Sequence, residues 1–247
     1  MSSRRRDPAR LRRMSGPAQG PGAIGILPAE AITKRIALEP TSLQGWEVQA
    51  MFQGALAAIE PEYGPALVLE HMQGDEGWWQ DIDHVMGYSR KMAGLWGLLW
   101  QAQGRCGVPP HSPEVSDPPT ADELRRWVHE REREIQRFLE GMGLSAKPEE
   151  LEEKGKVILA DLARLQISHG DLERSLRRQP PASPEAARAL LAELERLTIV
   201  QTDIFFRLGK LAFDRRREFD AREGLVSPPY LPCPCGSGKL AGACCSA

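Results

Sequence analysis

The sequence predicts an all-α protein, a helical bundle with a small zinc knuckle as its C-terminal tail. Apolar residues recur at three-, four- and seven-residue intervals through most of residues 29–223, which is the period of helices packed on a core. Helix-start signals precede several of these stretches, and no segment alternates apolar and polar residues as a half-buried strand does. Four of the five cysteines crowd into residues 233–245, as in a small metal site.

The chain is expected to divide into three parts. Residues 1–28 are rich in Arg, Ser, Gly and Pro, which predicts a disordered basic tail. Residues 29–223 form the helical domain, with a Pro-rich break at 105–120, and residues 224–247 form a linker and the knuckle. The basic tail is open to a second interpretation, in which Met14 is the initiator and residues 1–13 are not translated.

Bulk composition excludes several classes of protein. The net charge of −2 gives no general attraction to nucleic acid or membranes. No apolar run approaches the roughly 20 residues of a spanning helix. The basic start is followed by residues 15–22, which are rich in Gly and Pro and do not resemble the core of a signal peptide. We therefore expect a cytoplasmic protein with reduced thiols.

The first half of the domain predicts three helices. Thr41 and Gln44 form a capping box, so a helix should run from there to about Ile59, where Pro61 ends it. A second helix should cover residues 62–72, and a third about 77–103. The stripe expected to face the core on the third helix is Trp79, Ile82, Met86, Ala93, Trp96 and Trp100.

Three longer helices are predicted after the break. Thr120 and Glu123 form a second capping box, which opens a helix to about Met142. Another helix should begin at Pro148, and the longest should run from Ser183 to about Arg222. The residues expected to face inward are Leu124, Trp127, Ile135, Phe138 and Leu139, then Leu151, Val157, Ile158, Leu162 and Leu165, and last Ala187, Leu190, Leu194, Leu197, Ile204, Leu208 and Leu211, with Phe205, Phe206 and Phe213 widening that face.

The C-terminal cysteines have the spacing of a zinc site, with Cys-x-Cys followed after eight residues by Cys-Cys. Four thiolates leave no open coordination position, which is typical of a structural zinc site and not of a catalytic one. Gly236 and Gly238, with Ser237 between them, allow a tight turn whose backbone amides can face the sulfurs. Disulfides between the two cysteine pairs are the alternative. The predicted zinc ligands are Cys233, Cys235, Cys244 and Cys245.

Residues 233–245 resemble the SEC-C motif of the SecA C-terminal tail. The resemblance implies zinc binding and docking to a partner, such as the chaperone SecB or the ribosome, with Lys239 as a possible contact. Typical versions carry basic and aromatic residues before the final cysteines, where this chain has Leu240–Ala243. The basic docking surface is therefore largely missing.

The helical body is similar to the YecA/YgfB-like family of bacterial proteins over about residues 42–213. Residues 52–56, with Pro65 after them, resemble that family's early Gly-Phe-Leu helix, and residues 138–142 resemble its later Gly-Phe-Leu-x-Gly-Met stretch. Residues 189–206 resemble its final helix. Glu134 and Arg137 stand where the family has Trp and Gly.

The remaining candidates predict ordinary structure. Residues 81–84 contain two Asp and a His, which we expect to form a surface cluster. We expect Cys106 to be a free thiol. The Arg215–Arg217 run is read as a solvated helix face. No catalytic residues are predicted. The leading interpretation is a non-enzymatic zinc-binding adaptor, and the alternative is an RNA-binding protein that uses its Arg-rich N-terminus with the knuckle.

Overall fold

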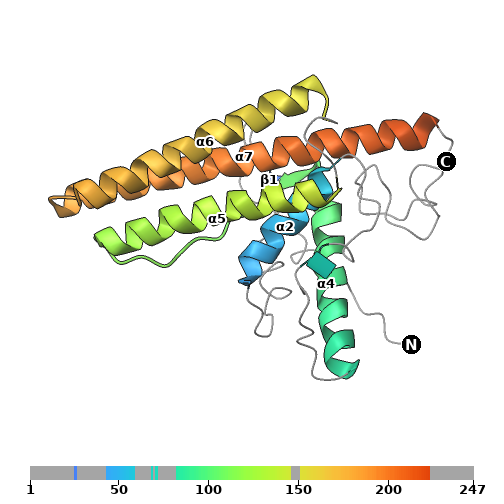
Figure 1. Cartoon of the computed structure of the whole chain (residues 1–247), viewed down its shortest axis with the longest axis horizontal. Coiled ribbons are helices and arrows are strands. Elements are labelled where there is room, and N and C mark those ends of the chain that lie inside the picture. The colour runs from blue at the N-terminus through green and yellow to red at the C-terminus, as the bar shows by residue number, and fades with distance from the viewer. Residues whose placement is uncertain are drawn as a thin grey trace, which may run out of the picture.

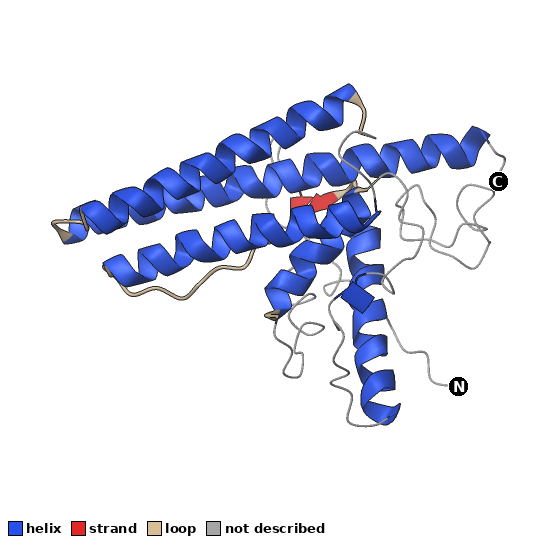
Figure 2. Cartoon of the chain, viewed as in Figure 1, coloured by secondary structure: helices blue, strands red, loops and turns tan. Residues whose placement is uncertain are grey.

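The computed structural model describes residues 25–26, 43–58, 68, 70–71, 82–145 and 151–222. Apart from one pair of two-residue strands, the regular structure in these ranges is helical (Figure 2), which confirms the all-α class for the described part. The basic tail, most of the predicted helix at 62–72, and the cysteine-rich tail lie outside the described residues. None of the helices described is long and apolar enough to cross a membrane.

Three long helices form the body of the fold: α5 (Ala121–Ser145), α6 (Glu153–Arg178) and α7 (Pro184–Arg222). They lie side by side, and each runs antiparallel to the helix before it (Figure 1). Ion pairs between Arg207 and Asp161 and between Arg215 and Glu152 fix the register of α7 against α6. The predicted boundaries of α7 are confirmed.

Two shorter helices complete the described structure. α2 (Gly45–Ala57) packs on α5 and α7, and α4 (Ile82–Ala102) packs on α2 and points away from the bundle (Figure 1). β2 (Cys106–Gly107) follows α4 and pairs in parallel with β1 (Gly25–Ile26). The Pro-rich chain after β2 packs against α5, where Arg126 donates to the Glu114 carbonyl at 2.7 Å.

Two of the predicted helix starts are confirmed. The Thr120 amide donates to Glu123 Oε2 at 2.7 Å, and the Glu123 amide donates to Thr120 Oγ1 at 3.2 Å. The bonds that Thr120 and Ser116 donate to the carboxylate lower the pKa of Glu123 to about 2. At the start of α7, Ser183 Oγ accepts a bond from the Ala186 amide at 3.2 Å. Both starts are local hydrogen-bonding units, so a short stretch of sequence determines them.

The predicted start of α2 at Thr41 is wrong. The helix begins at Gly45, and the amide of its N-cap, Gln44, donates to Glu47 Oε2 at 2.8 Å. Glu47 is also held by Arg133 and Arg137 of α5. The predicted capping box ends at Gln44, whereas the observed one ends at Glu47. The ion pairs from α5, which are distant in sequence, hold Glu47 in this position.

The predicted core stripe of α4 is also wrong. Met86 is 47% exposed and Trp100 42% exposed, while Trp79 lies outside the described residues. The helix has a second apolar stripe, and that stripe contacts α2. Trp96 is half-buried at the edge of this contact, and its ring lies edge-on to the Phe52 ring of α2 with centroids 5.4 Å apart. The buried residues of α4 are Tyr88, Met92, Leu95, Leu99 and Ala102.

Among the described residues, the apolar interior consists of three clusters. One joins α5, α6 and α7 near the α2 crossing and is centred on Phe138 and Phe205, whose rings stack 3.9 Å apart. The second joins α2 to α4 around Phe52 and Leu95. The third joins the bundle helices at their other end, around Trp127. Most predicted inward residues are buried, but Val157 is 55% exposed.

Candidate functional site

The predicted zinc ligands lie outside the described residues. So do the glycines and serine of the predicted turn and the predicted contact Lys239, and the structure therefore places none of them. The donor set itself fits the metal, because structural zinc sites commonly take four thiolates. The residues concerned are Cys233, Cys235, Gly236, Ser237, Gly238, Lys239, Cys244 and Cys245.

Within the described part, the clearest site is a layer of polar side chains inside the three-helix bundle. We call it the polar layer, and each of its members is at most 5% exposed. It lies between the apolar cluster around Phe138 and the one around Trp127. Its members are Arg131 and Glu134 of α5, His169 of α6, and Thr198 and Gln201 of α7.

An ion pair forms the centre of the polar layer. Arg131 NH1 lies 2.7 Å from Glu134 Oε2, and Gln201 donates to the same carboxylate oxygen. Arg131 NH2 also donates to the His111 carbonyl of the Pro-rich chain. Burial raises the pKa of Glu134, against the effect of Arg131 and of the hydrogen bonds. The layer therefore ties α5 to α7 and to the segment before α5.

His169 faces this ion pair without a bond of its own. Its side chain is wholly buried, and neither ring nitrogen has a hydrogen-bond partner among the residues that the structure describes. Burial, with a smaller effect from Arg131, lowers the pKa of His169 to about 4. The imidazole is therefore neutral at neutral pH.

A second polar joint links α2 to α5. The His111 ring stacks on Trp46 with centroids 5.4 Å apart, and the Arg133 guanidinium lies 5.7 Å from the same indole ring. His111 Nε2 lies 3.1 Å from Glu130 Oε2. Burial lowers the pKa of His111, although Glu130 opposes this. This joint holds the Pro-rich chain against both helices.

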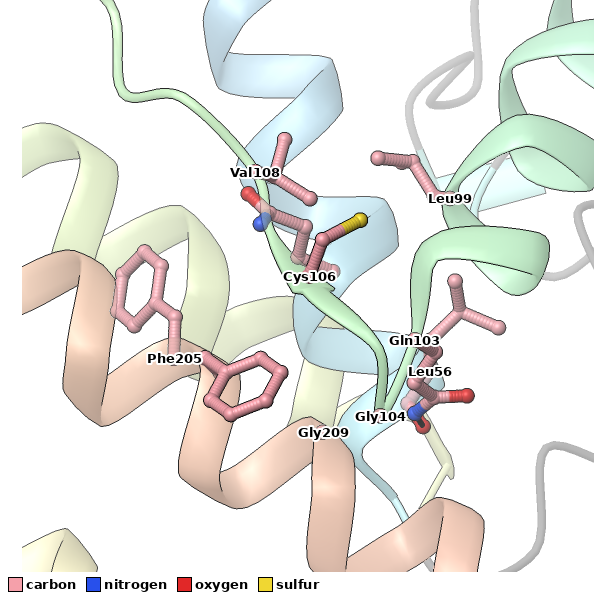
Figure 3. A pocket seen from close by; sticks show the side chains of 10 residues that line it. Leu56, Leu99, Gln103, Gly104, Cys106, Val108, Phe205 and Gly209 are labelled. Atoms are coloured by element: carbon pink, nitrogen blue, oxygen red, sulfur yellow. Dashed lines mark hydrogen bonds between the residues drawn. The ribbon is translucent and has the colours of Figure 1, made fainter. Parts of the chain in front are cut away.

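A small pocket opens where α2, α4 and α7 meet (Figure 3). It encloses about 30 Å³, which is room for about two waters. Cys106 lines it, and burial raises the pKa of that thiol, so the thiolate nucleophile is scarce at neutral pH. Gln103 also lines the pocket. Its side-chain amide nitrogen donates to the Leu56 carbonyl, and its amide oxygen accepts from Arg216.

Arg216 is not the solvated residue that the sequence predicts. Its NH1 group donates to the carbonyls of Leu56 at 3.2 Å and Ala58 at 3.1 Å, so it caps the end of α2. Its guanidinium also lies 4.8 Å from the ring of Trp100. Half-buried Arg216 thus joins α7 to α2 and α4.

The predicted surface cluster at residues 81–84 is only partly described, and its Asp83 is exposed. No group of three or more His, Cys, Asp or Glu side chains that could hold a metal occurs in the described ranges. Comparison with protein-family models, curated proteins and solved structures finds no match to this chain.

The polar layer was missed at the sequence level, although its positions follow the core register. On α5 it continues the spacing of Leu124, Trp127 and Phe138, and on α6 that of Leu162 and Leu165. The signal that could have found it is a charged or imidazole side chain at an inward helical position. A buried charge requires partners. Arg131 and Glu134 are three residues apart, but Gln201, which also binds Glu134, lies far away in sequence.

Proposed function

We propose that the protein is a non-enzymatic zinc-binding adaptor of the cytoplasm, in which the helical body presents a C-terminal knuckle to a protein partner. The observation that carries this proposal is the cysteine spacing of residues 233–245. Four thiolates would saturate the metal, which then fixes the fold of a short segment and activates no water. Zinc binding to such segments contributes about 10–16 kcal/mol to their folding, so the knuckle would form only with metal bound.

The course of α7 supports presentation of the knuckle by the body. This helix ends at Arg222, and its C-terminal end extends past the first turn of α6 (Figure 1). Only residues 223–232 separate that end from Cys233. A knuckle attached there would start from a projecting end of the bundle and would be accessible to a partner.

The interior of the body also supports an adaptor. The charged groups of the polar layer are used in internal bonds. Arg131 binds Glu134 of the same helix and the His111 carbonyl, and Glu134 also accepts from Gln201 of α7. Such a network fixes helix pairing and register. The pocket beside Cys106 is far smaller than the 300 Å³ or more that is ordinary for a small-molecule site.

We also propose the two family relationships, to SEC-C for the tail and to the YecA/YgfB-like proteins for the body. The stretches that carry the second resemblance include Gly54 and Gly141. A side chain at either glycine would collide with the backbone of the opposite helix. That close approach gives a physical reason for glycine in both stretches.

The partner surface would depend little on charge. Lys239 is the one basic residue in the knuckle, because residues 240–243 are Leu-Ala-Gly-Ala. Phosphate-rich partners such as the ribosome require several basic contacts. We therefore favour a protein partner, whether in the secretion machinery or elsewhere, that recognises the folded shape of the knuckle.

The test is a pull-down from lysate with three forms of the full chain. The variant C244S/C245S should lose both zinc and the captured partner and keep the helical circular dichroism of the wild type. The control variant C106S removes a cysteine outside the motif and should keep both. Unchanged capture by C244S/C245S would contradict the proposal.

RNA binding is the second candidate, because Arg4, Arg5, Arg6, Arg10, Arg12 and Arg13 face a single acid, Asp7. Binding through these arginines would weaken steeply with salt. Deletion of residues 1–13 should then reduce both the affinity for a single-stranded RNA and the salt slope. If the full chain does not bind that RNA at low salt, this candidate is excluded.

A further inference from the structure

We propose that His169 is a proton-sensitive latch that holds α6 in the bundle, so that acid releases α6 from α5 and α7 while α2 and α5 stay packed together. This inference is independent of the zinc knuckle. It rests on the burial of His169, on its two unpartnered nitrogens and on its place in the polar layer.

The first step concerns the side chain itself. His169 is the only polar side chain among the buried residues of α6, whose other buried members are Gly155, Ile158, Leu162, Leu165 and Leu176. Protonation would place a charge beside Arg131 in the buried polar layer, on a ring whose two nitrogens have no hydrogen-bond partner among the described residues. When α6 leaves the bundle, the charge is solvated. Acid therefore favours the released helix.

The second step concerns the groups around His169. Arg131 of α5 faces it and opposes its protonation. The carboxylate of Glu134 is already bound to Arg131 and Gln201. Glu132 of α5 approaches α6 beside Gly170, near Glu173 and Arg177 of α6 itself. From α7 the layer contributes only the uncharged Thr198 and Gln201.

The sign of the effect follows from the pKa. The pKa of His169 falls from 6.5 to about 4 on burial, so the released state binds the proton more tightly. The bound state is favoured above pH 6.5 and loses its advantage as the pH falls towards 4. Between pH 7.5 and pH 5 the equilibrium constant for release should rise about 30-fold. Glu134 and Glu132, whose pKa values are raised by burial, act in the opposite direction.

The third step explains why α6 responds and not the whole fold. α6 packs on α5 and α7, whereas α2 packs on α5, α7 and α4. The α2–α5 crossing itself is a backbone contact at Gly54 and Gly141. His111 lies beside it against Trp46, where its side chain keeps 34% exposure and Glu130 opposes the lowering of its pKa. Local opening follows the weakest set of contacts. Release of α6 would expose the apolar stripe of Ile158, Leu162 and Leu165.

The experiment measures hydrogen-exchange protection factors on the zinc-loaded full chain at pH 7.5 and pH 5, corrected for the intrinsic rate. Protection across residues 158–176 should fall at pH 5 in the wild type, by up to about 30-fold where His169 dominates over the opposing Glu134 and Glu132. Protection at residues 48–56 should stay. The variant H169L should show no such fall, and the control H129Q, which removes an exposed histidine of α5, should behave as the wild type.

A second variant and a direct titration keep the test decisive. H169Q replaces the imidazole by an uncharged polar group if H169L does not fold. Histidine C–H NMR shifts of the wild type should give His169 a titration midpoint well below the ordinary pKa of 6.5. The proposal is overturned if H169L or H169Q retains the acid-dependent loss in α6, if all helices lose protection equally, or if His169 titrates near 6.5.

Discussion

Gly54 of α2 and Gly141 of α5 lie against each other's helix backbones. A Cβ atom on Gly54 would be 1.8 Å from the Phe138 carbonyl oxygen, and one on Gly141 would be 1.9 Å from the Met51 carbonyl oxygen. No side chain fits in that space, so the crossing of α2 over α5 depends on two hydrogen atoms in place of two methyl groups.

This contact predicts that G54A and G141A each destabilise the protein by about 3 kcal/mol or more, because the backbones must separate. The control G143A lies on the same helix α5, where a Cβ meets nothing within 4 Å. It should stabilise the helix by about 0.5–1 kcal/mol, as Ala does at an unstrained helical position. Urea denaturation of the three variants measures both signs. Equal effects at Gly54 and Gly143 would contradict the close crossing.

Substitution of Glu47 should also destabilise the protein strongly, because its side chain is wholly buried at the start of α2. It accepts from Arg133 at 2.6 Å and from Arg137 at 3.2 Å. E47Q should cost about 2–3 kcal/mol, less than for a fully buried pair because both arginines are partly solvated. The matched control E193Q breaks the exposed pair with Arg196 and should leave the free energy of unfolding nearly unchanged. A similar loss for both variants would argue against the tie between α2 and α5.

Much of the fold could be predicted because much of it is local. The capping box of Thr120 and Glu123 and the cap at Ser183 are complete within a few residues, and both helices begin where the sequence places them. Which face of a helix is buried does not depend on neighbouring residues in sequence alone. α4 carries one stripe through Trp96 and Trp100 and another through Leu95 and Leu99, and only its packing on α2 selects the second.

The site could be predicted only where neighbours in sequence define it. The cysteine motif is visible because its donors lie close together along the chain. The polar layer is not, since Glu134 and Gln201 meet from different helices. The prediction for Arg216 was wrong for the same reason. Its acceptors Leu56 and Ala58 lie in the first third of the sequence, so the run of three arginines gives no sign that one of them is a cap.

The capping role of Arg216 predicts that alanine substitutions at Arg216 and Arg217 differ in their effect on stability. R216A should cost about 2 kcal/mol, because it removes charge-assisted bonds to two carbonyls at the end of α2. R217A is the control. Arg217 is exposed and its guanidinium lies 5.8 Å from the Phe213 ring, so its loss should cost about 0.5–1 kcal/mol at most. Thermal denaturation separates the two, and a larger effect at Arg217 would refute the capping role.

Glu123 predicts a pH dependence at the start of α5. Its pKa is lowered from 4.5 to about 2, so its ionised form stabilises the fold above pH 4.5, and that contribution is lost as the pH falls through about 2. E123Q should be less stable than the wild type at pH 7, and the two should converge as acid is added. The exposed Glu195 of α7 supplies the control E195Q, which should follow the wild type. A difference between E123Q and wild type that is the same at pH 7 and pH 2 would contradict the cap.

The adaptor account depends most on the metal in the C-terminal tail. Native mass spectrometry of the full chain, purified without added metal, should show one zinc ion per chain and intact thiols. The variant C244S/C245S and a chain ending at Arg222 should show none, while C106S should keep the ion. A zinc-free wild type with disulfides between the two cysteine pairs, or zinc retained by the chain that ends at Arg222, would contradict the account.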